Sequence, residues 1–150
     1  MQPHFATLLV PIAFCLGTQH NPVDTELGRL AGTWQVTGHE TNGKPTNEEH
    51  WRKVQFVFKG NQLTFVGDDI LSKKVAKITL AVDPSTSPRV IDLKIVAGEF
   101  KGTTLEGVYE IKDDGLRICF RNDETKNRPN DFSTKQDANL VLFVLKRQKN

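Results

Sequence analysis

The chain has two thiols, Cys15 and Cys119, and thiols are strong candidates for nucleophilic chemistry. A reactive cysteine needs a nearby base or positive charge that lowers its pKa. Cys119 has no histidine close to it in the sequence, and its predicted strand turns it to the outer face, opposite Glu110. Because a carboxylate raises the pKa of a thiol, we interpret Cys119 as a structural residue.

Two histidines, His39 and His50, stand near the carboxylates of Glu40, Glu48 and Glu49, and both residue types are common metal ligands. Their spacing matches no metal-binding motif, and the segment has the character of a solvated loop. We therefore predict no metal site. The acidic residues instead suit the first turn of a short helix, where the helix dipole favours negative charge.

Motifs for catalysis are missing from the sequence, which has no glycine-rich phosphate loop, no nucleophile elbow and no evident pair of catalytic carboxylates. We predict no enzymatic activity and no cofactor, although catalytic groups can converge from distant strands. Arg128 precedes Pro129 in the longest loop, and two roles for it remain open. It either meets an anionic group of a ligand or fastens this loop to the rest of the domain.

Alternation of apolar and polar residues dominates the chain from residue 33 onwards and is typical of half-buried β-strands. No amphipathic segment of helix length separates these stretches, so we expect an antiparallel sheet. Shorter helical segments are expected in residues 23–31 and 47–51 and in part of 122–138. The predicted strands are residues 33–41, 53–59, 62–67, 73–82, 89–96, 104–113, 116–121 and 139–147.

Two tight turns, Gly60-Asn61 and Asp114-Gly115, predict which side chains face inward. The first turn pairs Phe56 with Phe65, and the second pairs Tyr109 with Phe120. A shift of one residue in either hairpin would mix apolar and polar residues on both faces, which supports these registers. The predicted ligand-binding residues are the four aromatic side chains that the registers bring to mid-barrel: Phe56, Phe65, Tyr109 and Phe120.

The connections between the strands are alternately short and long. Turns 60–61, 83–88 and 114–115 fall at one end of an up-and-down barrel, and the long segments 42–52 and 122–138 fall at the other. Trp34 begins the first strand and Arg147 ends the last, so both lie at the end with the short turns. A barrel with one closed end and one end rimmed by loops follows from this pattern.

Gly32-Thr33-Trp34 before the first strand, with Arg147 after the last, resembles the lipocalin pattern. That resemblance implies an eight-stranded antiparallel up-and-down barrel in which the tryptophan closes one end and the arginine packs across its indole. Four further phrases are similar to a lipocalin-like domain family abundant in planctomycetes, to which no activity is assigned. They are Asp83-Pro84 followed by Ile91-Asp92-Leu93, Gly107-Val108-Tyr109-Glu110, Leu116-Arg117-Ile118-Cys119-Phe120, and Arg128-Pro129 followed by Phe132.

The composition and the N-terminal residues limit which partners and which location we expect for the protein. Twenty Lys+Arg against 18 Asp+Glu give a net charge of +2, with no basic run, so we expect no nucleic-acid partner. The apolar run of residues 5–16 is too short to span a membrane and suits a signal peptide of residues 1–17. We expect an exported, monomeric protein with a single barrel domain over residues 18–150, and a small apolar ligand as its partner. Lipid attachment through Cys15 and a buried or frayed N-terminal segment remain alternatives.

Two functions fit these expectations. The first is non-catalytic binding of a small, largely apolar molecule inside the barrel, with the Tyr109 hydroxyl orienting a polar end of the ligand. The second is an interaction module whose filled barrel displays segments 42–52 and 122–138. An eight-stranded barrel can be filled or can hold one small ligand. Small residues expected to face inward at Gly38, Ala76 and Gly107 favour open space.

Overall fold

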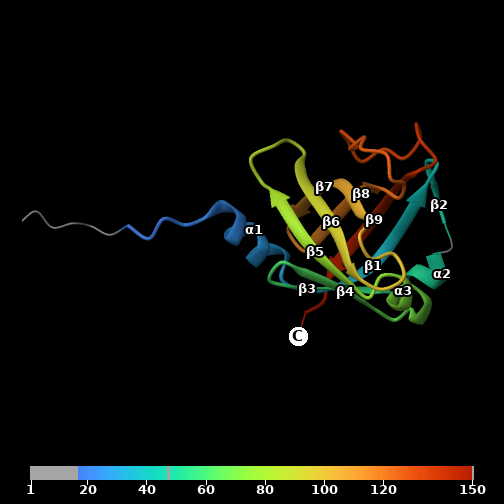
Figure 1. Cartoon of the computed structure of the whole chain (residues 1–150), viewed down its shortest axis with the longest axis horizontal. Coiled ribbons are helices and arrows are strands. Elements are labelled where there is room, and N and C mark those ends of the chain that lie inside the picture. The colour runs from blue at the N-terminus through green and yellow to red at the C-terminus, as the bar shows by residue number, and fades with distance from the viewer. Residues whose placement is uncertain (1–16, 47, 150) are drawn as a thin grey trace, which may run out of the picture.

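The computed structural model describes residues 17–46 and 48–149 and contains a sheet of nine strands, eight of which close into a barrel (Figure 1). The predicted signal peptide lies outside the described residues except for Gly17. The elements are α1 (Pro22–Leu30), β1 (Gly32–Thr41), β2 (Lys44–Pro45), α2 (Glu48–Trp51), β3 (Gln55–Lys59), β4 (Gln62–Val66), α3 (Asp69–Lys74), β5 (Lys77–Asp83), β6 (Arg89–Ala97), β7 (Thr104–Lys112), β8 (Gly115–Arg121) and β9 (Leu140–Arg147).

Closure of the barrel depends on β1, which pairs with two strands. Residues 32–35 pair with β3, and residues 34–41 pair with β9, in both cases antiparallel. The strands from β3 to β9 each pair antiparallel with the next, and β2 pairs only with the end of β1. The predicted eight-stranded, antiparallel up-and-down barrel with a short N-terminal helix is confirmed.

The two ends of the barrel differ as the lengths of the connections predicted. Helix α1 lies at the end that carries the short connections, whereas α2, α3 and the long segment 122–139 lie toward the other end (Figure 1). Asn21 begins α1 by accepting a hydrogen bond from the Val23 amide at 3.0 Å, and Pro22 follows in the first turn. The helix thereby covers the closed end, and its last residue, Leu30, is fully buried.

Trp34 and Arg147 form the floor of this closed end. The indole of Trp34 is fully buried, and its Nε1 donates a hydrogen bond to the Leu30 carbonyl at 2.7 Å. The Arg147 guanidinium lies 4.1 Å from the centre of the indole ring and donates to the carbonyls of Ala31 and Arg29. These carbonyls at the end of α1 have no partner within the helix, so one arginine both stacks on Trp34 and caps α1.

One predicted hairpin register is confirmed and the other is wrong. Phe56 lies opposite Phe65 on β3 and β4. On β7 and β8, however, Tyr109 lies opposite Ile118, and the two-residue turn is 113–114, with Asp113 at a φ of 53°. Aspartate tolerates this left-handed conformation, so Gly115 is free to begin β8. The register of this hairpin differs from the predicted one by two residues, so the side chains of β7 and β8 keep their predicted faces.

Helix α3 was not predicted from the sequence, because the predicted strands 62–67 and 73–82 leave only a short connection between them. The Asp68 carboxylate accepts hydrogen bonds from the amides of Ile70 and Leu71 at 2.8 and 2.9 Å, which begins the helix. The strand β5 therefore starts only at Lys77, and Ala76 is exposed instead of facing inward. An aspartate before an apolar pair is the local signal that could have found this helix.

Replacing Trp34 with alanine should lower the free energy of unfolding by about 3–5 kcal/mol, because it removes a fully buried aromatic side chain and its hydrogen bond. Urea unfolding measures this loss. Trp51→Ala is the control and should cost distinctly less, since Trp51 is only half-buried. A loss below about 1 kcal/mol for Trp34→Ala would contradict its role in closing the barrel.

Candidate functional site: an apolar cavity in the barrel

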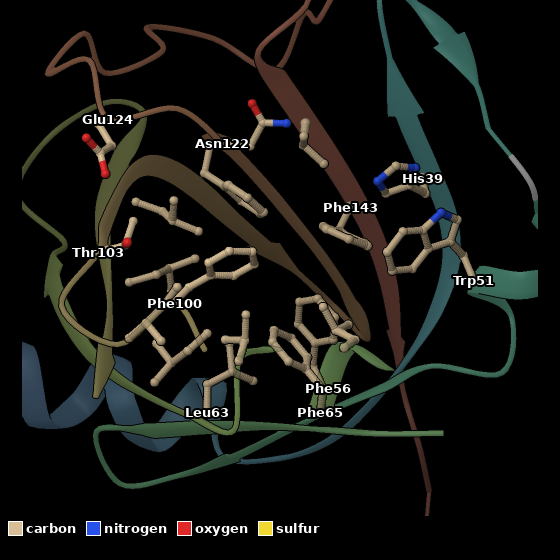
Figure 2. A pocket seen from close by; sticks show the side chains of 18 residues that line it. His39, Trp51, Phe56, Leu63, Phe65, Phe100, Thr103, Asn122, Glu124 and Phe143 are labelled. Atoms are coloured by element: carbon tan, nitrogen blue, oxygen red, sulfur yellow. The ribbon is translucent and has the colours of Figure 1, made fainter. Parts of the chain in front are cut away.

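A cavity of about 410 Å³ lies in the half of the barrel away from α1 (Figure 2). Residues of the barrel strands form its wall, and Trp51 of α2, Leu71 of α3 and Phe100 of the β6–β7 connection contribute at its mouth. Most lining side chains are apolar or aromatic. The polar ones are His39, Thr103, Asn122 and Glu124.

Phe143 of β9 is the centre of the aromatic wall. Its ring centre lies 4.7 Å from that of His39, 5.0 Å from that of Trp51 and 5.1 Å from that of Phe56. Phe120 lies nearly parallel to it at 6.0 Å. Rings that pack against one another in this way are held in place along the wall, so they bound the cavity without filling it.

Three of the four predicted ligand-binding residues line this cavity. Phe56 and Phe65 meet edge to face at 4.7 Å, as their register predicted, and Phe120 faces them within the same cavity. Phe120 lies opposite Gly107, where a Cβ atom would come within 2.9 Å of the Phe120 Cβ and 2.6 Å of the Cys119 carbonyl oxygen. Glycine at 107 therefore permits the close approach of β7 and β8 beside Phe120.

Tyr109, the fourth predicted residue, lies outside the cavity and belongs to the closed end. Its side chain faces inward and is 1% exposed, but its hydroxyl donates a hydrogen bond to Glu26 Oε2 of α1 at 2.9 Å. Arg29 donates to the other oxygen of Glu26 at 2.6 Å, and Arg89 lies 3.7 Å away. Although burial opposes it, hydrogen bonds from Arg29 and Tyr109 hold the pKa of Glu26 below its ordinary value.

His39 lines the cavity, and the sequence placed it outside. The register of β1 against β9 shifts between Val36 and Gly38, which is a β-bulge. Val36 faces the core before the bulge; after it, His39 lies opposite the inward-facing Phe143, and Gly38 lies opposite the exposed Val144. The prediction that Gly38 faces inward is therefore wrong. An isolated glycine within a strand is a signal for such a bulge and could have revealed the change of face.

The surroundings of His39 keep its imidazole neutral. Trp51 stacks on the ring at 4.2 Å, with 19° between the planes, and Thr46 Oγ1 forms a hydrogen bond with Nδ1. Burial, with a further contribution from the nearby His50, lowers the pKa of His39 to about 4. His39 therefore offers the cavity an uncharged hydrogen-bonding group at physiological pH.

The mouth of the cavity is organised by a contact between α2 and the start of α3. His50 Nε2 of α2 lies 2.8 Å from Asp68 Oδ2, while Asp68 Oδ1 begins α3. Trp51 and Leu71, which line the cavity, are carried by these two short helices. The contact thus fixes the position of two apolar side chains at the mouth.

Residues 122–138 are held against the outside of the barrel. Arg128 Nη1 donates to the carbonyls of Ile91 and Gly107 at 3.2 and 2.9 Å, and its Nη2 lies 2.8 Å from Asp92 Oδ1. Arg121 pairs with Asp137 near the end of the segment at 2.6 Å. Of the two roles left open for Arg128, the structure shows the fastening of this loop.

Cys119 lies beneath the same segment. It faces outward from the barrel, as predicted, but Phe132 covers it, and it lies opposite Val108, not Glu110. The thiol is 0% exposed, and burial raises its pKa to about 11. Such a thiol is not a nucleophile at neutral pH.

Comparison with known proteins gives no assignment: no family model, no curated protein and no solved structure matches the chain. Within residues 17–46 and 48–149, no group of three His, Cys, Asp or Glu side chains is arranged to hold a metal ion. No helix in this part of the chain is long and apolar enough to span a membrane.

The buried imidazole of His39 should make stability depend on pH in a defined window. Its pKa is lower in the folded state than the ordinary 6.5, so the unfolded chain takes up the proton first as the pH falls. Stability from this group is present above pH 6.5 and is lost progressively toward pH 4, by about 2–3 kcal/mol. Urea unfolding from pH 7 to pH 4 should therefore be less pH-dependent in His39→Phe than in the wild type; equal slopes would contradict this assignment.

Tyr109→Phe should separate the closed end from the cavity. Loss of the hydroxyl removes one hydrogen bond from the buried Glu26 carboxylate and should lower the free energy of unfolding by about 1–3 kcal/mol. A molecule bound in the cavity should keep its affinity, because Tyr109 does not line it. Urea unfolding and a binding titration of the same variant measure the two effects. Weakened binding by a folded variant would show that Tyr109 contributes to the binding site.

Proposed function

We propose that this protein binds a small, largely apolar molecule in the interior of its barrel without transforming it chemically. The observation that carries the proposal is the cavity of about 410 Å³ with aromatic and aliphatic walls. Ligand sites commonly occupy roughly 300–1,000 Å³ and are lined mainly by such side chains. Among the described residues that line it, only His39 and Glu124 have ionisable side chains, which supports binding over catalysis.

The same proposal includes export and a relationship to the lipocalin-like barrels. The stacked Trp34 and Arg147 at the closed end support that relationship, and the apolar run of residues 5–16 supports export. A barrel that carries an apolar molecule through an aqueous compartment gains from an interior that is closed at one end. Helix α1 and Trp34 provide this closure.

Display of loops by a filled barrel has less support. Residues 122–138 are fastened to the outer wall through Arg128 and Arg121, and Phe132 covers Cys119 there. A cavity above roughly 300 Å³ is what a ligand-binding barrel requires and what a filled scaffold lacks.

Titration with N-phenyl-1-naphthylamine, an uncharged apolar dye whose fluorescence rises in apolar surroundings, tests the proposal. The wild type should bind one dye molecule. Leu105→Trp, which puts a larger side chain into the cavity wall, should weaken binding by about tenfold or more, equivalent to at least ~1.4 kcal/mol.

Val144→Trp is the matched control, because Val144 lies on β9 but is exposed on the outer face. It should bind the dye as the wild type does. No dye binding by the wild type, or equal binding by Leu105→Trp, would contradict the proposal. If the dye binds as expected, native mass spectrometry of protein purified from its own host would give the mass of the natural ligand.

A further inference from the structure

His39 presents an unused hydrogen-bonding atom to the cavity. Its Nδ1 is bonded to Thr46 Oγ1, whereas no hydrogen bond to Nε2 is found within residues 17–46 and 48–149. Trp51 and Phe143 pack against the ring and hold its orientation. Figure 2 shows the His39 ring at the edge of the cavity with a nitrogen on the cavity side.

From this geometry we infer that the bound molecule is uncharged, fits among aromatic rings, and carries one hydroxyl or carbonyl group that hydrogen-bonds with Nε2 of His39. The inference rests on the proposed function and names the class of ligand. His39 is then the residue that determines specificity in a cavity whose walls are otherwise mainly apolar.

The charge of the lining residues favours an uncharged ligand. No lysine or arginine is among the described residues that line the cavity, and the one carboxylate there, Glu124, is exposed at the mouth. His39 is itself uncharged at neutral pH, since its pKa is lowered to about 4. A carboxylate buried in such a cavity would lose its hydration without gaining a cation, which is costly.

The bond to Thr46 decides which polar groups can meet His39. A threonine hydroxyl can donate to Nδ1 or accept from it, so the imidazole can present either an acceptor or an N–H at Nε2. A ligand hydroxyl suits both tautomers, and a carbonyl suits the one with the proton on Nε2. Thr103 is the other half-buried polar side chain of the lining, and it lies on the opposite side of the cavity in Figure 2.

Three molecules with the same aromatic frame test the inference by isothermal titration calorimetry at pH 7: naphthalene, 2-naphthol and 2-naphthoate. The wild type should bind 2-naphthol about 2- to 10-fold more tightly than naphthalene, the effect of one added hydrogen bond. It should bind 2-naphthoate at least about tenfold more weakly than 2-naphthol.

His39→Phe keeps the ring and its packing on Trp51 but removes Nε2. This variant should bind naphthalene within about twofold of the wild type and should lose the preference for 2-naphthol. Thr103→Val removes the other half-buried polar group of the lining and should keep the preference, because the inference assigns the polar group of the ligand to His39.

The outcomes separate the inference from the proposed function. If naphthalene and 2-naphthol both fail to bind the wild type, the proposed function fails and the inference falls with it. If the wild type binds both equally, or binds 2-naphthoate as tightly as 2-naphthol, only the inference is overturned. The same holds if the preference survives in His39→Phe or disappears in Thr103→Val.

Discussion

The β-bulge in β1 is the constraint on which both ends of this barrel depend. β1 must pair with β3 and with β9 to close the sheet, and it places Trp34 and Val36 in the core on one side of the bulge. The extra residue, Thr37, donates its hydroxyl to the Val144 carbonyl and lets the strand continue in the opposite phase. One strand can thereby close the floor with Trp34 and place His39 at the cavity.

The fold was largely predictable from the sequence because it follows from repeated local signals. Alternation in eight segments, the Gly60-Asn61 turn and the lengths of the connections each predict the same barrel. Much less of the site was predictable. His39 depends on a single inserted residue that reverses the phase of one strand, and Tyr109 depends on a two-residue difference in one hairpin. Neither changes the overall pattern of alternation.

The interior is filled at one end and open at the other because of where the large side chains lie. Trp34 and Tyr109, the two largest fully buried side chains of the described chain, occupy the closed end. Toward the mouth the aromatic rings pack edge to face or nearly parallel with one another, as Phe56 does with Phe65 and Phe120 with Phe143. Because these rings pack against their neighbours along the wall, they do not extend across the barrel, and space remains between the opposite walls.

Polar interactions are divided between the two ends in a way that separates stability from binding. At the closed end, Glu26 is buried and satisfied by Tyr109 and Arg29, so α1 is bound to the barrel by charged hydrogen bonds. At the cavity, the half-buried His39 is neutral, with one nitrogen bonded to Thr46. The closed end can therefore hold the barrel together without placing a charge in the cavity. What the cavity selects then depends on apolar fit and on the imidazole of His39.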